Sequence, residues 1–187
     1  MTESRPARSD WLTLPNAITV ARLLIVVPIG ILLLHDEAPV WTAVLVALFG
    51  MSDWVDGFIA RRLGQTSRVG ELIDPIADRI GVVAIAVLLV ISGHLPLWIA
   101  LLIAGTDVLL FVFWLFHRNA KIPPVTMVGK VRTAAIMFGL ALIVVGRIPE
   151  SDVLMFIGVV LTGIGAVLHV LTGFGYARAI LRSGPGA

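Results

Sequence analysis

The chain has 187 residues, of which 58% are hydrophobic and only 14% are charged, and its mean hydropathy is +1.01. Soluble globular domains are about 45–50% apolar and about 25% charged, so this composition excludes a soluble globular protein. The net charge of only +2 indicates no nucleic-acid-binding surface, and the absence of cysteine excludes disulfides, thiolate metal sites and a cysteine nucleophile.

Six apolar runs, each bounded by charged residues, proline or glycine, predict membrane-spanning helices. A helix that crosses a bilayer needs about 20 mostly apolar residues, and most of the runs approach that length. In chain order the predicted spans cover residues 14–34, 40–60, 74–92, 96–116, 131–146 and 153–177. The sequence therefore predicts an all-α, polytopic membrane protein with six transmembrane helices.

The six spans are expected to form a single domain over residues 14–182. Residues 1–13 read as a polar N-terminal segment on the cytoplasmic side. Residues 183–187, which contain only Ser, Gly, Pro and Ala, predict a disordered tail.

The basic residues predict the orientation of these spans. If all six runs cross the membrane, 13 of the 14 lysines and arginines share one side with both termini, and only Arg147 lies opposite. By the positive-inside rule the crowded side is cytoplasmic, which predicts a protein of the cytoplasmic membrane. The acidic residues Asp36, Glu37, Glu150 and Asp152 are then expected to face outward.

Four aspartates lie in or against the second and third spans, where one such side chain costs about 2.5–3.5 kcal/mol near a helix centre. Asp53 and Asp56 are spaced i, i+3, which places them on one face of a helix. Asp74 and Asp78, spaced i, i+4, share a face of the next helix in the same way. A short connection brings the two faces together, and four carboxylates without cysteine or histidine nearby select hard divalent cations. The sequence predicts two Mg²⁺ or Mn²⁺ ions here.

Small residues and an arginine follow the first aspartate pair. Gly57 and Ala60 leave helix surface that a ligand can approach closely, and Arg61 can donate two parallel hydrogen bonds to a phosphate. Together with the metals, they predict a site for a phosphorylated lipid or nucleotide. The alternative is structural, with the small residues allowing close helix packing and Arg61, Arg62 and Arg68 acting as membrane anchors.

With Gly70, these residues spell the motif D-x2-D-G-x2-A-R-x8-G-x3-D-x3-D. The motif resembles the signature of the CDP-alcohol phosphotransferase family, whose core has six spans. A second likeness is the P-N-x2-T-x2-R opening of that family's first helix, matched here by Pro15, Asn16, Thr19 and Arg22.

The resemblance implies a homodimer in which each subunit transfers the phosphatidyl group of CDP-diacylglycerol to an acceptor hydroxyl and releases CMP. It implies that Asp78 is the general base, which takes the proton of the acceptor hydroxyl as the new O–P bond forms. The implied ligands of two metal ions per subunit are Asp53, Asp56, Asp74 and Asp78. The implied CDP-binding positions are Asp53, Asp56, Gly57, Ala60 and Arg61.

A second basic cluster opens the fifth span, on the same side as the aspartates. Lys130, Arg132 and Thr133 offer two cations and a hydroxyl to an acceptor phosphate. The branch of the family that makes glycerophospholipids has a similar G-K-x-K-T element. The alternative is that Lys130 and Arg132 are only positive-inside residues.

Two further polar residues lie within predicted spans. Asp107 in the fourth span is compatible with a polar contact between helices and with a catalytic role. His169 in the last span is expected to be a hydrogen-bonded interior histidine rather than a ligand.

The acceptor is predicted from short segments. Phosphatidylglycerophosphate synthases usually carry an Arg–Glu pair in the fourth span, whereas residues 105–108 read Gly-Thr-Asp-Val. This x-D-V-x-L segment looks more like the cardiolipin synthases, which predicts phosphatidylglycerol as the acceptor, with glycerol 3-phosphate and an inositol-type alcohol as alternatives. A cation transporter is the alternative from another class, but its acidic residues would follow a path across the membrane rather than cluster at one end of two helices.

Overall fold

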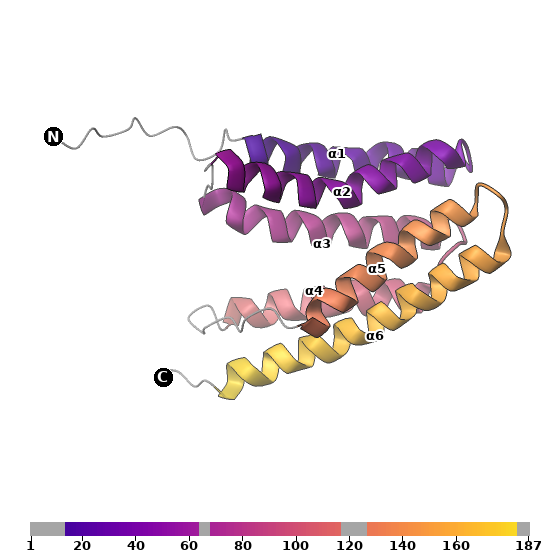
Figure 1. Cartoon of the computed structure of the whole chain (residues 1–187). Coiled ribbons are helices and arrows are strands. Elements are labelled where there is room, and N and C mark those ends of the chain that lie inside the picture. The colour runs from indigo at the N-terminus through magenta and orange to yellow at the C-terminus, as the bar shows by residue number, and fades with distance from the viewer. Residues whose placement is uncertain (1–13, 64–67, 117–126, 183–187) are drawn as a thin grey trace.

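The computed structural model describes residues 14–63, 68–116 and 127–182, with side chains for 17–52, 76–116, 127–179 and 181. The predicted N-terminal segment (1–13) and tail (183–187) lie outside the described residues. The described chain is all-helical (Figure 1). Its helices are α1 (Leu14–Leu34), α2 (Pro39–Leu63), α3 (Arg68–Ile91), α4 (Leu97–Phe116), α5 (Met127–Gly146) and α6 (Asp152–Arg182).

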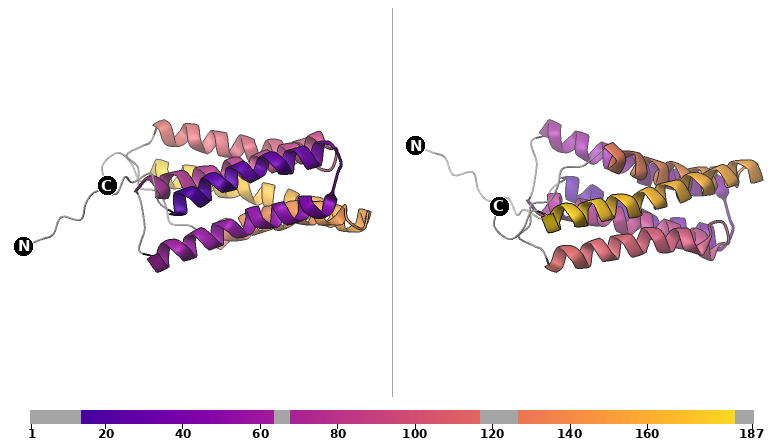
Figure 2. Two further views of the ribbon diagram at one scale, coloured as in Figure 1. Left: turned by 90° about the horizontal axis from the view of Figure 1, so that it is seen from above. Right: turned by 90° about the horizontal axis from the view of Figure 1, so that it is seen from below.

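The helices run up and down in one bundle (Figures 1 and 2). Helix α1 packs on α2 and α3, α4 packs on α6, and α5 lies along α6 while also contacting α2 and α3. We call the end at which α1, α3 and α5 begin and α2, α4 and α6 end the proximal end, and the opposite end the distal end. Both carboxylate-bearing helices of the sequence motif, α2 and α3, therefore rest on α1.

The outside of the bundle is apolar. Large apolar side chains that project outward include Leu24, Leu109, Phe138, Phe156 and Phe174. So much exposed apolar surface would be unfavourable in water but is matched to lipid. Within the residues that the structure describes, four stretches are long and apolar enough to cross a membrane: Ala17–Leu34, Leu97–Phe116, Met127–Gly146 and Asp152–Ala179. The chain is a multi-pass membrane protein.

Several helix bounds differ from the predicted spans. Helix α3 begins at residue 68 rather than 74, α5 at 127 rather than 131, and α6 continues to 182 rather than 177. Each added turn carries charged residues such as Arg68, Lys130 and Arg178, which hydropathy assigns to the aqueous phase. Arg, Lys and Glu are good helix formers, so the helices continue beyond the apolar stretch.

Helices α5 and α6 make the closest contact, because glycines leave no side chain between their backbones. A Cβ atom added to Gly139 would lie 2.6 Å from the backbone nitrogen of Thr162, and one added to Gly158 would lie 2.7 Å from that of Ile143. Gly165 repeats the arrangement against the backbone nitrogen of Ile136, at 2.9 Å. Small residues at helix contacts are typical of membrane proteins, in which close packing stabilises helix pairs.

The substitution Gly158→Ala is expected to lower the melting temperature of the detergent-solubilised protein by about 2–10 °C. The new methyl group meets backbone atoms of α5, which cannot rotate away. The matched control is Gly175→Ala on the same helix, where nothing lies within 4 Å of the added Cβ atom. This control should keep or slightly raise the melting temperature, because alanine is the better helix former. Equal melting temperatures for both variants would contradict the close α5–α6 contact.

An ion pair connects two inter-helix turns at the distal end. The buried Arg147, which follows α5, donates a hydrogen bond from Nη2 to the carboxylate of Asp36, which follows α1. Arg147 and Asp36 were both expected on the side away from the other basic residues, and they meet here. Burial lowers the pKa of the nearby His94, and the positive charge of Arg147 lowers it further, whereas Asp36 opposes the shift. His94 is therefore neutral at pH 7.

Candidate functional site

The polar residues singled out from the sequence lie in one band across the proximal half of the bundle. At about 1.5 Å per residue, Arg22 lies roughly 12 Å from the start of α1 and Arg132 roughly 8 Å from the start of α5. Asp107 lies roughly 14 Å from the end of α4 by the same measure. The backbone of α2 and α3 carries Asp53, Asp56 and Asp74 through this same band.

Most of the predicted metal and nucleotide site falls outside the described side chains. Only the helix that carries each residue is described for Asp53, Asp56, Gly57, Ala60, Arg61 and Asp74. Among the described side chains, no three His, Cys, Asp or Glu residues gather as they would around a metal ion. The metal site therefore stays a prediction. Of its four predicted ligands, Asp78 is the one whose side-chain contacts the structure describes.

Asp78 is held by an arginine inside the bundle. Arg22 on α1 donates Nη1 to Oδ1 of Asp78, and its Nε donates to Oγ of Ser52 at 2.8 Å. The Arg22 side chain is fully buried, whereas 35% of the Asp78 side chain is exposed. Arg22 thus joins α1, α2 and α3 and holds the partly exposed carboxylate of Asp78. The buried guanidinium of Arg22 offsets the negative charge of the Asp78 carboxylate inside the bundle.

A second polar cluster, which we call the histidine network, consists of Arg79, Asp107, Arg132, His169 and Thr172. Nη1 of Arg79 donates to Oδ1 of Asp107 at 2.5 Å, and Nε2 of His169 lies 3.0 Å from the same oxygen. Nδ1 of His169 accepts a hydrogen bond from Nη1 of Arg132, which also donates to Oγ1 of Thr172 at 2.9 Å. The network joins α3, α4, α5 and α6.

The network shows the contacts of two residues whose roles the sequence left open. His169 is buried and hydrogen-bonded on both ring nitrogens, which confirms the expected interior histidine. Asp107 makes polar contacts with α3 and α6, as one of its two interpretations required.

The three residues predicted to bind the acceptor point in different directions. Arg132 is buried and faces the interior, whereas Lys130 and Thr133 are exposed. Oγ1 of Thr133 donates to the backbone carbonyl of Gly129 at 3.1 Å, one turn back on the same helix. Of the three, Arg132 alone joins the histidine network.

Sequence reasoning missed the pairing of Arg22 with Asp78 and the link of Arg79 to Asp107. A usable signal was present, because an arginine within an apolar helix needs a partner. The identity of the partner was beyond reach, since 56 residues separate Arg22 from Asp78.

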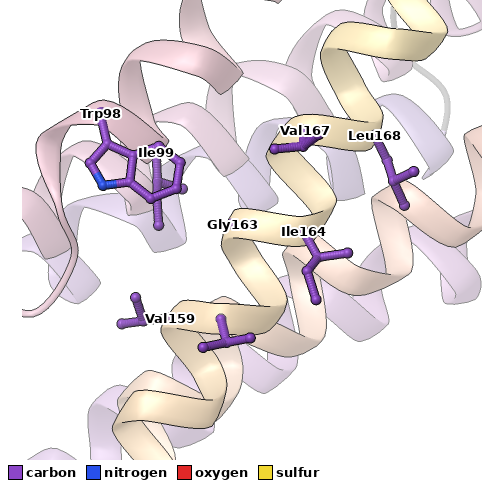
Figure 3. Close-up of a pocket in the computed structure, with 8 residues that line it drawn as sticks. Trp98, Ile99, Val159, Gly163, Ile164, Val167 and Leu168 are labelled. Atoms are coloured by element: carbon purple, nitrogen blue, oxygen red, sulfur yellow. The ribbon is translucent and has the colours of Figure 1, made fainter.

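A hollow of about 440 Å³ lies between α4 and α6, toward the distal end (Figure 3). Apart from Gly163, its lining consists of apolar side chains: Trp98, Ile99, Val159, Val160, Ile164, Val167 and Leu168. These residues offer no acid, base or nucleophile, so the hollow is separate in place and chemistry from the proximal band.

Comparison with known proteins finds one matching family model and several named relatives. Residues 12–170 match the family model described as CDP-alcohol phosphatidyltransferase. A Mycobacterium tuberculosis protein named "Putative cardiolipin synthase" is 37% identical over 138 residues, which cover 73% of this chain but only 66% of that relative. The cardiolipin synthase (CMP-forming) of Streptomyces coelicolor is 34% identical over 75% of this chain and 69% of its own length. The CDP-diacylglycerol–glycerol-3-phosphate 3-phosphatidyltransferase of Rickettsia typhi is 30% identical over 89% of this chain and 96% of its own.

Proposed function

Because the chain belongs to the CDP-alcohol phosphatidyltransferase family, we propose that it moves the phosphatidyl group of CDP-diacylglycerol to a glycerol-type hydroxyl and releases CMP. The observation that carries this proposal is the extent of the family match, since residues 12–170 include the whole aspartate motif and the residues around it. The match favours such an enzyme over the cation transporter.

We propose phosphatidylglycerol as the acceptor, which makes cardiolipin the product. Two relatives that are 34% and 37% identical to this chain carry cardiolipin synthase names, in line with the x-D-V-x-L segment around Asp107. Glycerol 3-phosphate is the second candidate acceptor. The Rickettsia typhi relative favours it, because that alignment covers nearly the full length of both proteins.

The proposed reaction is a direct displacement at the β-phosphorus of CDP-diacylglycerol. Asp78 takes the proton of the acceptor hydroxyl as the O–P bond forms, and Arg22 keeps its carboxylate in place. When bound, two Mg²⁺ or Mn²⁺ ions would polarise the pyrophosphate and neutralise charge on the departing CMP. The proposed metal ligands are Asp53, Asp56, Asp74 and Asp78, and the proposed CDP-binding residues are Asp53, Asp56, Gly57, Ala60 and Arg61.

We assign the acceptor site to the start of α5. Lys130 is exposed near the proximal end, where it meets an incoming phosphate first, and Arg132 lies deeper, inside the bundle. Thr133 adds a hydroxyl to the exposed part of the site. Cations at two depths would draw a charged acceptor from the membrane surface into the band that holds Asp78.

The proposal extends to the architecture. Helices α2 and α3 are proposed to cross the membrane as well, which makes residues 14–182 one six-span domain with both termini and the site on the cytoplasmic side. The alternating helix directions and the distribution of basic residues support this orientation. Two such subunits are proposed to form a homodimer.

A transfer assay tests the function and the acceptor together. Purified protein is mixed with radiolabelled CDP-diacylglycerol, Mn²⁺ and either phosphatidylglycerol or glycerol 3-phosphate, and the lipids are then separated. Label should enter cardiolipin in the first mixture. Label in phosphatidylglycerophosphate alone would assign the second acceptor. Unreacted CDP-diacylglycerol in both mixtures, in the presence of fresh metal, would contradict phosphatidyl transfer to either acceptor.

A further inference from the structure

The hydrogen-bond donors fix the direction of the contacts in the histidine network. A guanidinium group can only donate, so Nδ1 of His169 must accept the hydrogen bond from Arg132. The proton of a neutral imidazole then lies on Nε2, which donates it to Asp107 at 3.0 Å. His169 is therefore a neutral bridge that connects the guanidinium of Arg132 to the carboxylate of Asp107.

The network carries more positive than negative charge. Within the described side chains, Arg79 and Arg132 bring two cations against the single carboxylate of Asp107, and the two arginines repel each other. Nε of Arg132 is buried and has no hydrogen-bond partner in the described part of the chain. A buried donor without a partner and an uncompensated charge between membrane helices are both costly. One anion bound beside the two arginines would relieve both.

The position of the network suggests what that anion is. Arg79 follows Asp78 directly on α3, and consecutive helical side chains point about 100° apart. Asp78 accordingly reaches Arg22 on α1, whereas Arg79 reaches Asp107 on α4. Because 45% of the Arg79 side chain is exposed, an anion can reach the network from outside the bundle.

We propose that Arg79 and Arg132 bind the phosphate of the acceptor, and that His169 is a positioning residue that orients Arg132 through its contact with Asp107. The inference rests on the proposed transfer function and adds Arg79 and His169 to its acceptor site. The phosphodiester of phosphatidylglycerol and the phosphomonoester of glycerol 3-phosphate present the same chemistry to two guanidinium groups, so the proposal covers either acceptor.

Three substitutions at His169 separate positioning from a general packing role. His169→Asn keeps an acceptor near the place of Nδ1, so it can still hold Arg132. His169→Gln keeps an amide near the place of Nε2 and so preserves only the contact with Asp107. His169→Leu removes both contacts. KM is measured for CDP-diacylglycerol and, in separate series, for phosphatidylglycerol and glycerol 3-phosphate.

The acceptor KM is expected to rise about 10- to 100-fold in His169→Leu, the loss that follows when a charge-assisted hydrogen bond is misplaced. The KM for CDP-diacylglycerol should stay within about twofold, and His169→Asn should restore the acceptor KM better than His169→Gln. Arg178→Gln, which removes an exposed cation of α6 outside the network, is the matched control and should change neither KM. Equal changes in the KM for CDP-diacylglycerol and the KM for the acceptor would overturn the positioning role. An equal rescue of the acceptor KM by His169→Asn and His169→Gln would overturn it as well. If His169→Leu does not fold, the comparison of His169→Asn with His169→Gln still decides the matter.

Inorganic phosphate tests the anion site without turnover. It should raise the melting temperature of the wild-type protein above that in sodium chloride of equal ionic strength, and it should compete with the acceptor in the assay. Arg79→Gln should lose this stabilisation, and Arg178→Gln should keep it. The anion site would be overturned if phosphate stabilised neither the wild-type protein nor Arg79→Gln. It would also be overturned if phosphate stabilised both. Phosphate binding without any transfer would leave the anion site standing and contradict the proposed function instead.

Discussion

Asp74→Asn is expected to reduce phosphatidyl transfer by at least about 10³-fold while the protein remains folded. The substitution removes the charge of one proposed metal ligand but keeps the size of the side chain. A metal ion that polarises a phosphoryl group contributes several kcal/mol of transition-state stabilisation, which corresponds to a rate loss of about this size. Because the same ions are proposed to hold the pyrophosphate, CDP-diacylglycerol binding should fall together with turnover, and Asp53→Asn and Asp56→Asn should behave alike.

The measurement is an initial rate at saturating acceptor, with the melting temperature as a test of folding. EDTA should abolish the activity of the wild-type protein, and Mg²⁺ or Mn²⁺ should restore it. The matched control is Asp152→Asn, which changes an exposed aspartate at the distal start of α6 and should leave the rate intact. Full activity of Asp74→Asn would remove that residue from the ligand set, and full activity after exhaustive EDTA treatment would refute the metal site altogether.

Asp78→Asn should separate binding from chemistry. Turnover is expected to fall by about 10²–10⁴, which is the usual contribution of a positioned general base. Binding of CDP-diacylglycerol should weaken by no more than about tenfold, because Asp53, Asp56 and Asp74 are proposed to hold most of the metal and nucleotide. The amide oxygen of the new side chain can still accept the hydrogen bond from Arg22, so the fold should be retained.

Asp78→Ala supplies the comparison for stability. It leaves the fully buried Arg22 without the Asp78 carboxylate. Breaking a fully buried ion pair costs about 3–5 kcal/mol, and the 35% exposure of Asp78 makes the cost smaller here. Its melting temperature should therefore lie well below that of Asp78→Asn. Affinity for CDP-diacylglycerol and single-turnover rate are measured side by side. If Asp78→Asn loses binding as completely as Asp53→Asn, Asp78 is mainly a metal ligand, and Asp74, one turn away, becomes the candidate base.

The helices were predictable because hydropathy reports directly on them. The first and fourth predicted spans agree with α1 and α4 to within one residue, since charged or polar residues flank both apolar runs closely. The starts of α3 and α5 were not predictable in this way. Hydropathy reports where a segment leaves the hydrocarbon, whereas a helix ends only where its backbone hydrogen bonds end.

The sequence predicts a metal and nucleotide site, which stays a prediction, but it could not predict the contacts that the structure describes. Two aspartate pairs at helical spacing, and an arginine within the first span, are visible in the sequence. The partners of the buried polar residues are not visible in the sequence, because helices far apart along the chain bring them together. Arg22 meets Asp78 across 56 residues, and Asp107 meets His169 across 62 residues. The same limit applies to Lys130, Arg132 and Thr133. Their closeness in sequence suggested one binding surface, but the rotation of α5 turns only Arg132 inward.

The length of α6 and its close contact with α5 determine how the bundle responds to the thickness of its membrane. The apolar stretch of helix α6, Asp152–Ala179, has 28 residues and is about 42 Å long, whereas the hydrocarbon core of a bilayer measures about 30 Å. Such hydrophobic mismatch is relieved by tilting or by local thickening of the bilayer. The glycine contacts at Gly139, Gly158 and Gly165 fix α5 to α6, so the two helices must tilt as one body, as their slant against α1 in Figure 1 shows. Helix α1, at 21 residues, matches the bilayer without such a tilt. A thinner or thicker membrane is therefore expected to move Arg132 and His169 relative to Arg22 and Asp78. The distance between the two polar clusters would then depend on the thickness of the lipid bilayer.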